Sequence, residues 1–309
     1  YRKDYLKKKI EINEQELRAI QYDFSDFDSG NEYIDPAHLY TYDLDVFGDY
    51  SLFQYINRTS TPVGKQHLAD WFNAHLELKE SIEQRQEAIR ELSTDLEYRQ
   101  QIRLFGLLYK GKPADINEIR EWAGSPSYYR KHTLLRIIPT VVSIINLICI
   151  GSAIVGILPA TVPGGVFFCF VIFSSIFSKG ITKLQATYGK KLQILSTYAD
   201  QILLTEKKEM NSPVLQQLKT ELTSQNQTAS QAVRQLSKLM NALDQRSNLL
   251  MSTILNGLIF WELRQVMRIE KWKETHASDL PRWIETIGEI DAYCSLACLL
   301  YTSDAADEL

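Results

Sequence analysis

Hydrophobic positions are most concentrated in the middle of the chain, where residues 134–177 contain a single charged residue, Arg136. A segment rich in turn-forming residues, 158–165, divides this stretch in two. The first part, 137–157, would make a helix about 31 Å long, close to the thickness of the hydrocarbon core of a bilayer. The second part, 166–177, can also span when some of the preceding loop is included. The pattern predicts a transmembrane hairpin of two helices.

The charges beside this hairpin predict its orientation. The connecting loop is uncharged, and basic residues flank the hairpin on both sides: Arg130, Lys131 and Arg136 before it, and Lys179, Lys183, Lys190 and Lys191 after it. By the positive-inside rule, both flanking arms are expected in the cytoplasm. Pro139 and Asn146 in the first helix are tolerated in a span when neighbouring groups satisfy them. The alternative is a buried helical hairpin inside a large soluble core.

A second apolar run, Leu249–Leu263, is 15 residues long and contains Asn256 and Glu262. That length suits a core helix better than a membrane span. We therefore expect a buried core helix here, which can continue to Trp272.

Elsewhere, apolar residues recur at helical spacing. Thr61 and Pro62 form a helix start signal, because threonine can cap a helix and proline suits its first position. Residues 80–92 are amphipathic, and Pro281 opens a last helix. No run of strand length alternates between apolar and polar residues. The sequence predicts an all-α fold.

Composition restricts the function classes. The chain has 309 residues and a net charge of −4, with 34 Lys and Arg against 38 Asp and Glu. Between Glu11 and Asp49 there are eleven acidic residues and one basic residue, Arg18, and such a segment repels phosphates. A strongly basic nucleic-acid module is thereby excluded. Four cysteines in this length do not make a disulfide scaffold, and five histidines show no metal-ligand spacing.

The sequence has no G-x-x-x-x-G-K-[ST] phosphate loop. Gly64 and Lys65 match the end of that motif, but Thr59 stands where its first glycine is required. No nucleophile elbow, zinc-protease helix or kinase signature is present. We therefore expect no catalytic, cofactor-binding or metal-binding residues in this chain.

Two stretches carry an ordered set of motifs. The first comprises Asp43–Gly48, Ser51–Lys65, Leu68–Phe72 and Ile82–Leu92, and the other is Ile287–Ala297. Both resemble the core, or lever, domain of the MutS family of mismatch-repair ATPases, and Ile287–Ala297 is similar to the lever helix that returns to the ATPase domain. Within the first stretch, we expect arginines at the surface or in ion pairs, and short polar residues in turns and caps; they are Arg58, Arg85 and Arg90, and Asn57, Thr59 and Thr61.

The resemblance implies a membrane-associated bacterial MutS-like protein, with its hairpin in the bacterial inner membrane. It also implies an all-α lever that couples ATP binding and hydrolysis to conformational change. It implies an ATPase domain after Ala297, with ATP and Mg²⁺ bound there and a homodimer formed through it. It also implies DNA binding in soluble relatives, which the acidic charge balance here does not support. The hairpin stands where such relatives carry a DNA clamp, and Phe260-Trp261-Glu262 matches their mismatch wedge by chance. The alternative is a non-enzymatic membrane scaffold whose helical arms bind other proteins.

These observations give an expected division of the chain into five parts. They are a charged helix and acidic linker at 1–41, a first core part at 42–133, the hairpin at 134–178, a second core part at 179–297, and a tail at 298–309. The tail resembles the translation of a sequencing adapter. We therefore expect it to be non-native and the chain to be a fragment that lacks the ATPase domain.

Overall fold

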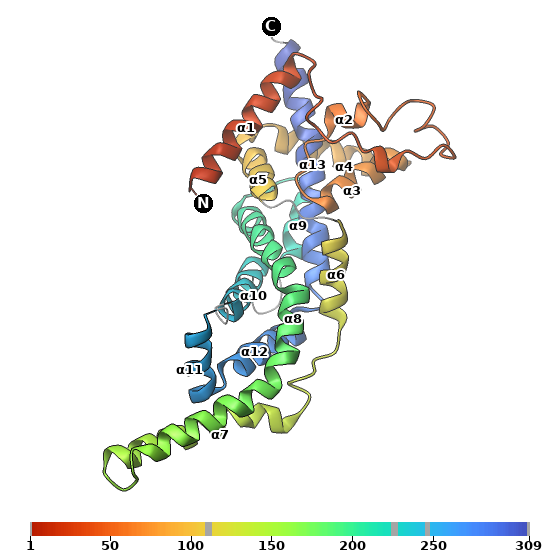
Figure 1. Cartoon of the computed structure of the whole chain (residues 1–309). Coiled ribbons are helices and arrows are strands. Elements are labelled where there is room, and N and C mark those ends of the chain that lie inside the picture. Colours follow the sequence, from red (N-terminus) through yellow and green to blue (C-terminus); the bar gives the residue numbers. More distant parts are fainter. Residues whose placement is uncertain (1, 109–112, 224–227, 245–247, 308–309) are drawn as a thin grey trace. The chain divides into compact units, whose positions relative to one another are not determined.

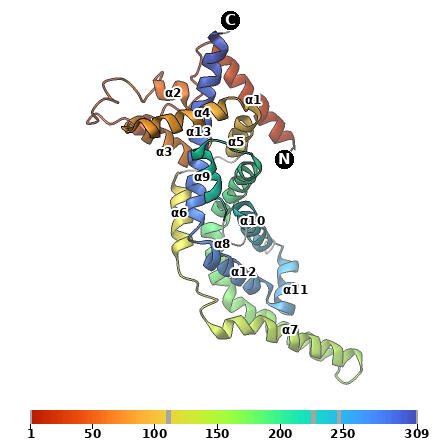
Figure 2. The same ribbon diagram turned by 180° about the vertical axis from the view of Figure 1, so that it is seen from behind.

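The computed structural model describes residues 2–108, 113–223, 228–244 and 248–307, and these are mostly helical (Figures 1 and 2). The helices are α1 (Arg2–Ile20), the 3-10 helix η1 (Asn31–Tyr33), α2 (Leu52–Ile56), α3 (Pro62–Asn73), α4 (Lys79–Ser93), α5 (Leu96–Leu108), α6 (Pro113–Gly124), α7 (Thr133–Ile154), α8 (Thr161–Lys207), α9 (Pro213–Glu221), α10 (Ala229–Asp244), α11 (Leu249–Ile259), α12 (Trp261–His276) and α13 (Leu280–Asp307). Within the described ranges no strand forms, and an isolated bridge joins Thr223 to Thr228. The predicted all-α fold is confirmed.

The chain forms two compact units, each assembled from separated segments. The first unit contains Tyr1–Ile116, Thr197–Gln231 and Pro281–Leu309, and the second contains Asn117–Ser196 and Ala232–Leu280. The predicted hairpin therefore belongs to the second unit, while the two stretches that carry the motifs belong to the first.

In the first unit, aromatic and aliphatic side chains of α2, α3 and the preceding loop pack against α13. The buried cluster consists of Val46, Phe47, Phe53, Leu68, Ala69 and Ala292, with Tyr33, Trp71, Phe72 and Leu296 at its edge. Helix α3 begins as the sequence predicts: the Thr61 hydroxyl accepts a hydrogen bond from the Gly64 amide at 3.0 Å, and Pro62 occupies the first turn.

The acidic segment after α1 was expected to be a linker, but it packs on this core. Phe27 is buried, and its carbonyl accepts a hydrogen bond from Gln54 Nε2 at 2.9 Å. Asp28 forms an ion pair with Lys65 at 2.8 Å. The segment therefore contributes buried residues to the first unit, while its acidic side chains from Asp23 to Asp49 are exposed.

In the second unit, α7 and the beginning of α8 form the apolar hairpin (Figure 1). Helices α11 and α12 both pack against α7. The side chains of Lys179, Lys183, Lys190 and Lys191, the basic flank predicted after the hairpin, lie outside the described residues.

The prediction of one core helix over Leu249–Leu263 is wrong. Helix α11 ends at Ile259 and α12 begins at Trp261, because Phe260 between them has left-handed backbone angles (φ 52°, ψ 49°). The Phe260 side chain is buried, with its ring centre 5.8 Å from that of Phe173 on α8. This aromatic contact offsets the cost of the left-handed conformation.

Helix α11 is also more exposed than a core helix. Leu250 is 78% exposed, and Met251 and Ile254 are exposed as well. The two polar residues of the run form the junction between the helices, because Asn256 Oδ1 accepts a hydrogen bond from the Glu262 amide at 3.0 Å. The Asn256 side chain therefore satisfies one free amide in the first turn of α12, whose N-cap residue is Phe260. Hydrophobicity alone did not indicate this role.

Candidate functional site

The two motif stretches meet in the first unit at the carboxylate of Asp291. This side chain of α13 is 1% exposed. Its Oδ2 accepts hydrogen bonds from the Ser60 amide at 2.9 Å, from the Thr61 amide at 2.8 Å and from the Thr61 hydroxyl at 2.8 Å. Its Oδ1 accepts a bond from the Ser60 hydroxyl at 3.1 Å. Four donors from the loop before α3 therefore converge on one residue of α13.

The electrostatics of Asp291 follow from this position. Burial raises the pKa of its carboxyl to about 6, because removal from water disfavours the charged form. The four hydrogen bonds act in the opposite direction and limit the rise. One turn further along α13, the Ser295 hydroxyl donates to the Ile56 carbonyl and accepts from the Arg58 amide, both at 2.8 Å. Together, Asp291 and Ser295 fix the loop over residues 56–61 to α13.

Two glycines allow α3 and α13 to approach closely at this junction. A Cβ atom on Gly64 would fall within 3.0 Å of the Asp291 side chain, and one on Gly288 within 3.0 Å of the Val63 side chain. Any larger residue at either position would force the two helices apart. The crossing therefore requires glycine on both helices.

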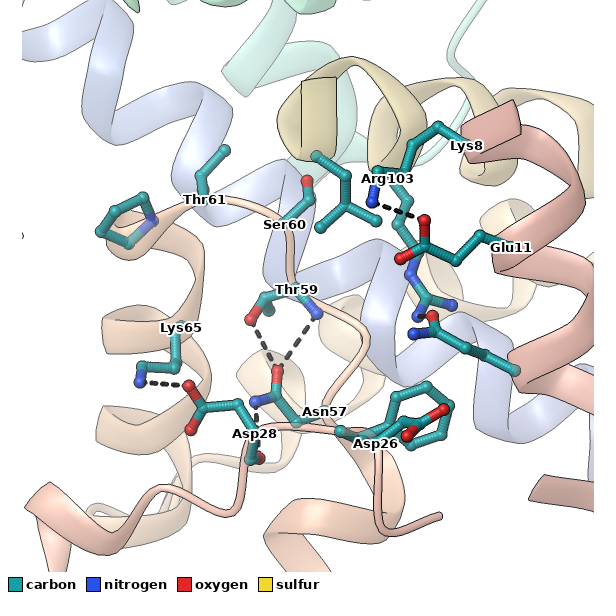
Figure 3. Close-up of a pocket in the computed structure, with 14 residues that line it drawn as sticks. Lys8, Glu11, Asp26, Asp28, Asn57, Thr59, Ser60, Thr61, Lys65 and Arg103 are labelled. Atoms are coloured by element: carbon teal, nitrogen blue, oxygen red, sulfur yellow. Dashed lines mark hydrogen bonds and ion pairs between the residues drawn. The ribbon is translucent and has the colours of Figure 1, made fainter. Parts of the chain in front are cut away.

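Beside this junction lies a cavity of about 400 Å³ between α1, α3 and α5 (Figure 3). Its charged side chains already have partners: Lys8 pairs with Glu11 at 2.6 Å, and Lys65 pairs with Asp28. Arg103 donates to Gln15 at 2.8 Å. Across the part of the chain that the structure describes, no group of three or more His, Cys, Asp or Glu could hold a metal ion.

The second unit presents the apolar hairpin. Thr133–Ile154 and Thr161–Ser178 are long and apolar enough to cross a membrane, and few of their residues are buried. Their exposed large side chains are Leu134, Ile137, Val141, Ile144, Ile145, Leu147, Ile148, Ile150, Ile154, Phe168, Ile172, Phe173 and Ile176. The alternative of a hairpin buried within its own chain does not agree with this exposure.

Polar contacts join the hairpin to the rest of its unit. Asn146 is buried, and its Nδ2 donates to the carbonyls of Gly257 and Leu258 at 3.0 Å each. Arg264 Nη2 donates to the Pro139 carbonyl at 2.7 Å and to the Ser143 hydroxyl at 2.8 Å. These bonds give the side chains of Asn146 and Ser143, two polar residues of α7, partners on α11 and α12.

The chain segment that enters α7 is held by one buried carboxylate on α12. Glu270 Oε1 accepts hydrogen bonds from the amides of Tyr128 at 2.8 Å and Tyr129 at 3.0 Å. Glu270 Oε2 accepts one from the amide of Arg130 at 2.7 Å. The direction in which the chain enters the hairpin is therefore fixed by backbone contacts to α12.

One protein-family model matches most of the chain, including segments of both units. The family model of MutS domain III matches residues 39–297. The chain belongs to the MutS family. The match confirms the predicted core, or lever, domain, and it includes both the Asp291 junction and the complete hairpin. A search of curated proteins and a search of solved structures each found no match.

In this MutS domain III, Arg58 forms the expected ion pair and Asn57 and Thr59 the expected turn, whereas Arg85 is half-buried against an aromatic ring. Arg58 forms an ion pair with Glu16 at 3.1 Å, and the Arg85 guanidinium lies 4.3 Å from the ring centre of Trp71. The Thr59 amide donates to Asn57 Oδ1 at 3.1 Å in a turn. The most connected polar residues, Asp291, Glu270 and Arg264, were not singled out from the sequence. A single charged residue on a helix gives no signal of a partner more than 100 residues away.

Proposed function

We propose that this chain is the lever region of a membrane-anchored MutS-family protein, with the hairpin spanning the bilayer and both flanking arms in the cytoplasm. The observation that carries the proposal is the position of the hairpin, which lies inside the range matched by MutS domain III. The exposure of its apolar side chains supports insertion, because soluble proteins rarely leave such continuous apolar surface in water. Arg130, Lys131 and Arg136 support a cytoplasmic base.

In this proposal, α13 transmits conformational change that ATP binding and hydrolysis drive in an ATPase domain of the same protein. The Asp291 and Ser295 contacts and the close crossing with α3 support it, because they attach α13 to α3 and to the loop before α3. The residues of this chain do not themselves fit ATP and Mg²⁺, since the sequence has no phosphate loop. In the protein with its ATPase domain, ATP should change the hydrogen exchange of α13. Unchanged exchange during ATP hydrolysis would contradict the lever.

Alkaline carbonate extraction of bacterial membranes tests the anchor. We expect the chain to remain in the membrane pellet. The test variant carries Leu147→Arg and Ile172→Arg, at positions that are 73% and 70% exposed. Each arginine at the centre of a span costs about 2.5–3.5 kcal/mol of insertion free energy, so the variant should be largely extracted.

Leu39→Arg is the matched control, because Leu39 is 91% exposed and lies in the first unit. It should remain in the pellet like the unaltered chain. Release of the unaltered chain by carbonate as a soluble protein would refute the anchor. It would favour a hairpin that packs against another protein, the scaffold alternative.

Labelling of single cysteines tests the orientation. After the four native cysteines are replaced by alanine, a cysteine at Ala160 in the connecting loop should react with an impermeant maleimide added outside intact cells that lack their outer membrane. A cysteine at Lys131 should react only after the inner membrane is permeabilised. The reverse pattern would refute the proposed orientation.

A further inference from the structure

A cleft of about 200 Å³ lies in the second unit, at the base of the hairpin. Its lining comes from the beginning of α7, the residue Arg130 just before it, and α12. The lining residues are Arg130, Arg136, Pro139, Thr140, Arg264, Met267, Arg268 and Lys271. Five of these residues are basic and none is acidic, in a chain whose net charge is −4. The positive charge is therefore a local property of this cleft.

The helix period explains how α12 contributes to the cleft. Arg264, Arg268 and Lys271 recur at intervals of four and three residues, which places them on one face of the helix. Arg136 lies in the first turn of α7, and α12 packs against α7. Like charges arranged in this way repel one another unless an anion lies between them.

Two of the five cations have partners within the protein. Arg130 Nε pairs with Glu274 Oε2 at 2.8 Å, and Arg264 donates to carbonyl and hydroxyl oxygens of α7. Arg136, Arg268 and Lys271 are exposed and form no ion pair among the residues that the structure describes. These three side chains are available to bind a ligand.

We propose that this cleft binds the phosphate of an anionic phospholipid, a proposal that rests on the membrane anchor above. Arg136 is three residues from the start of α7, which corresponds to about 4.5 Å along the helix axis. With α7 inserted, the cleft lies at the level of the lipid headgroups. A guanidinium group can donate two parallel hydrogen bonds to two oxygens of one phosphate. Basic residues beside a span also attract anionic headgroups. The ligand class is thus a phosphodiester whose acyl chains extend beside the exposed apolar face of α7.

The test uses the complete chain, purified in a zwitterionic detergent and titrated with phosphatidylglycerol or phosphatidylcholine, with bound lipid counted by native mass spectrometry. Each basic residue at an anionic surface contributes about fivefold in affinity. We therefore expect a preference for phosphatidylglycerol on the order of 100-fold from the three exposed residues. The variant Arg136→Gln, Arg268→Gln, Lys271→Gln should lose this preference.

Two matched variants distinguish binding at this cleft from general electrostatic attraction between the chain and an anionic lipid. Arg2→Gln, Lys3→Gln, Lys7→Gln removes the same charge from exposed positions of α1 and should keep the preference. Arg136→Lys, Arg268→Lys, Lys271→Arg preserves the charge and should keep most of it. An equal loss in the α1 variant, or a full preference in the glutamine variant of the cleft, would overturn the proposal.

Carbonate extraction, applied to the cleft variant and to the unaltered chain, distinguishes a failure of the lipid-site proposal from a failure of the membrane-anchor proposal. A cleft variant that stays in the membrane and still prefers phosphatidylglycerol refutes the lipid site but leaves the anchor intact. Release of the unaltered chain refutes the anchor itself. Inorganic phosphate or a short DNA duplex is added in competition as a further arm. If either displaces phosphatidylglycerol at a similar concentration, the site is one for free phosphate or nucleic acid and the lipid assignment is wrong.

Discussion

Replacing Asp291 with alanine tests the junction at which the two motif stretches meet. The substitution removes the acceptor of four hydrogen bonds in a buried site. The hydroxyls of Ser60 and Thr61 can rotate toward other acceptors, but their two backbone amides cannot. A buried donor without an acceptor costs about 1–3 kcal/mol, so two amides predict a loss of about 2–6 kcal/mol in the free energy of unfolding.

The conservative substitution Asp291→Asn should behave differently. Oδ2 accepts three of the four bonds, and an asparagine oxygen at that position retains them. The amide nitrogen then lies where Oδ1 was and can donate to the Ser60 hydroxyl. We therefore expect Asp291→Asn at neutral pH to remain within about 1 kcal/mol of the unaltered chain.

Urea unfolding of the purified chain in mild detergent, followed by far-ultraviolet circular dichroism, measures these differences. Asp70→Ala is the control, because Asp70 is an exposed residue of α3 that accepts one bond from Gln66. It should change the free energy of unfolding by no more than about 0.5 kcal/mol. If Asp291→Ala is as mild as this control, the buried network does not hold α13 to the loop before α3, and the argument for the junction is refuted.

Three further predictions concern the same structural features. Gly288→Ala should lower the free energy of unfolding by about 1–3 kcal/mol, because its Cβ would overlap Val63, and Val63→Ala in the same chain should restore part of the loss in urea unfolding. Glu270→Ala should speed hydrogen exchange of the amides of Tyr128, Tyr129 and Arg130 at least tenfold, measured by mass spectrometry; unchanged exchange would contradict their bonds to this carboxylate. Because the pKa of Asp291 is raised from 3.8 to about 6, its contribution to stability is complete below pH 3.8 and is lost as the pH rises through 6. Between pH 7 and pH 4, the free energy of unfolding of the unaltered chain should therefore rise by about 2 kcal/mol relative to that of Asp291→Asn. A difference that stays constant with pH would contradict the raised pKa.

Local sequence signals predicted much of the fold. The helical class followed from the spacing of apolar residues, and the start of α3 followed from Thr61 and Pro62, because capping depends on neighbouring residues alone. The two long apolar helices followed from length and hydrophobicity. The family followed from motifs whose residues are mostly core, turn and cap positions, so their order was informative even though none of them forms a catalytic group.

The division at Phe260 could not be predicted in the same way. Residues 249–263 are apolar throughout most of their length, and an aromatic residue gives no local signal for left-handed backbone angles. The break depends on contacts of the Phe260 ring with α8, which begins about 100 residues earlier in the chain. The sequence pattern places Asn256 and Glu262 within one core helix, whereas their hydrogen bond satisfies a first-turn amide of the separate helix α12.

Hydrogen bonds attach the hairpin to its unit, and its apolar surface explains why such bonds are needed. Within a bilayer, lipid tails solvate leucine and isoleucine as well as a protein does, so apolar contact alone gives a spanning helix little preference for its own domain. Hydrogen bonds do give that preference, because an unsatisfied polar group in hydrocarbon is costly. In this chain Asn146 and Arg264 supply such bonds along α7, and Glu270 supplies them at its entry. On the proposed function, a hairpin that spans the bilayer requires a defined attachment to its own unit, and these three residues supply hydrogen bonds for it where hydrophobic packing cannot.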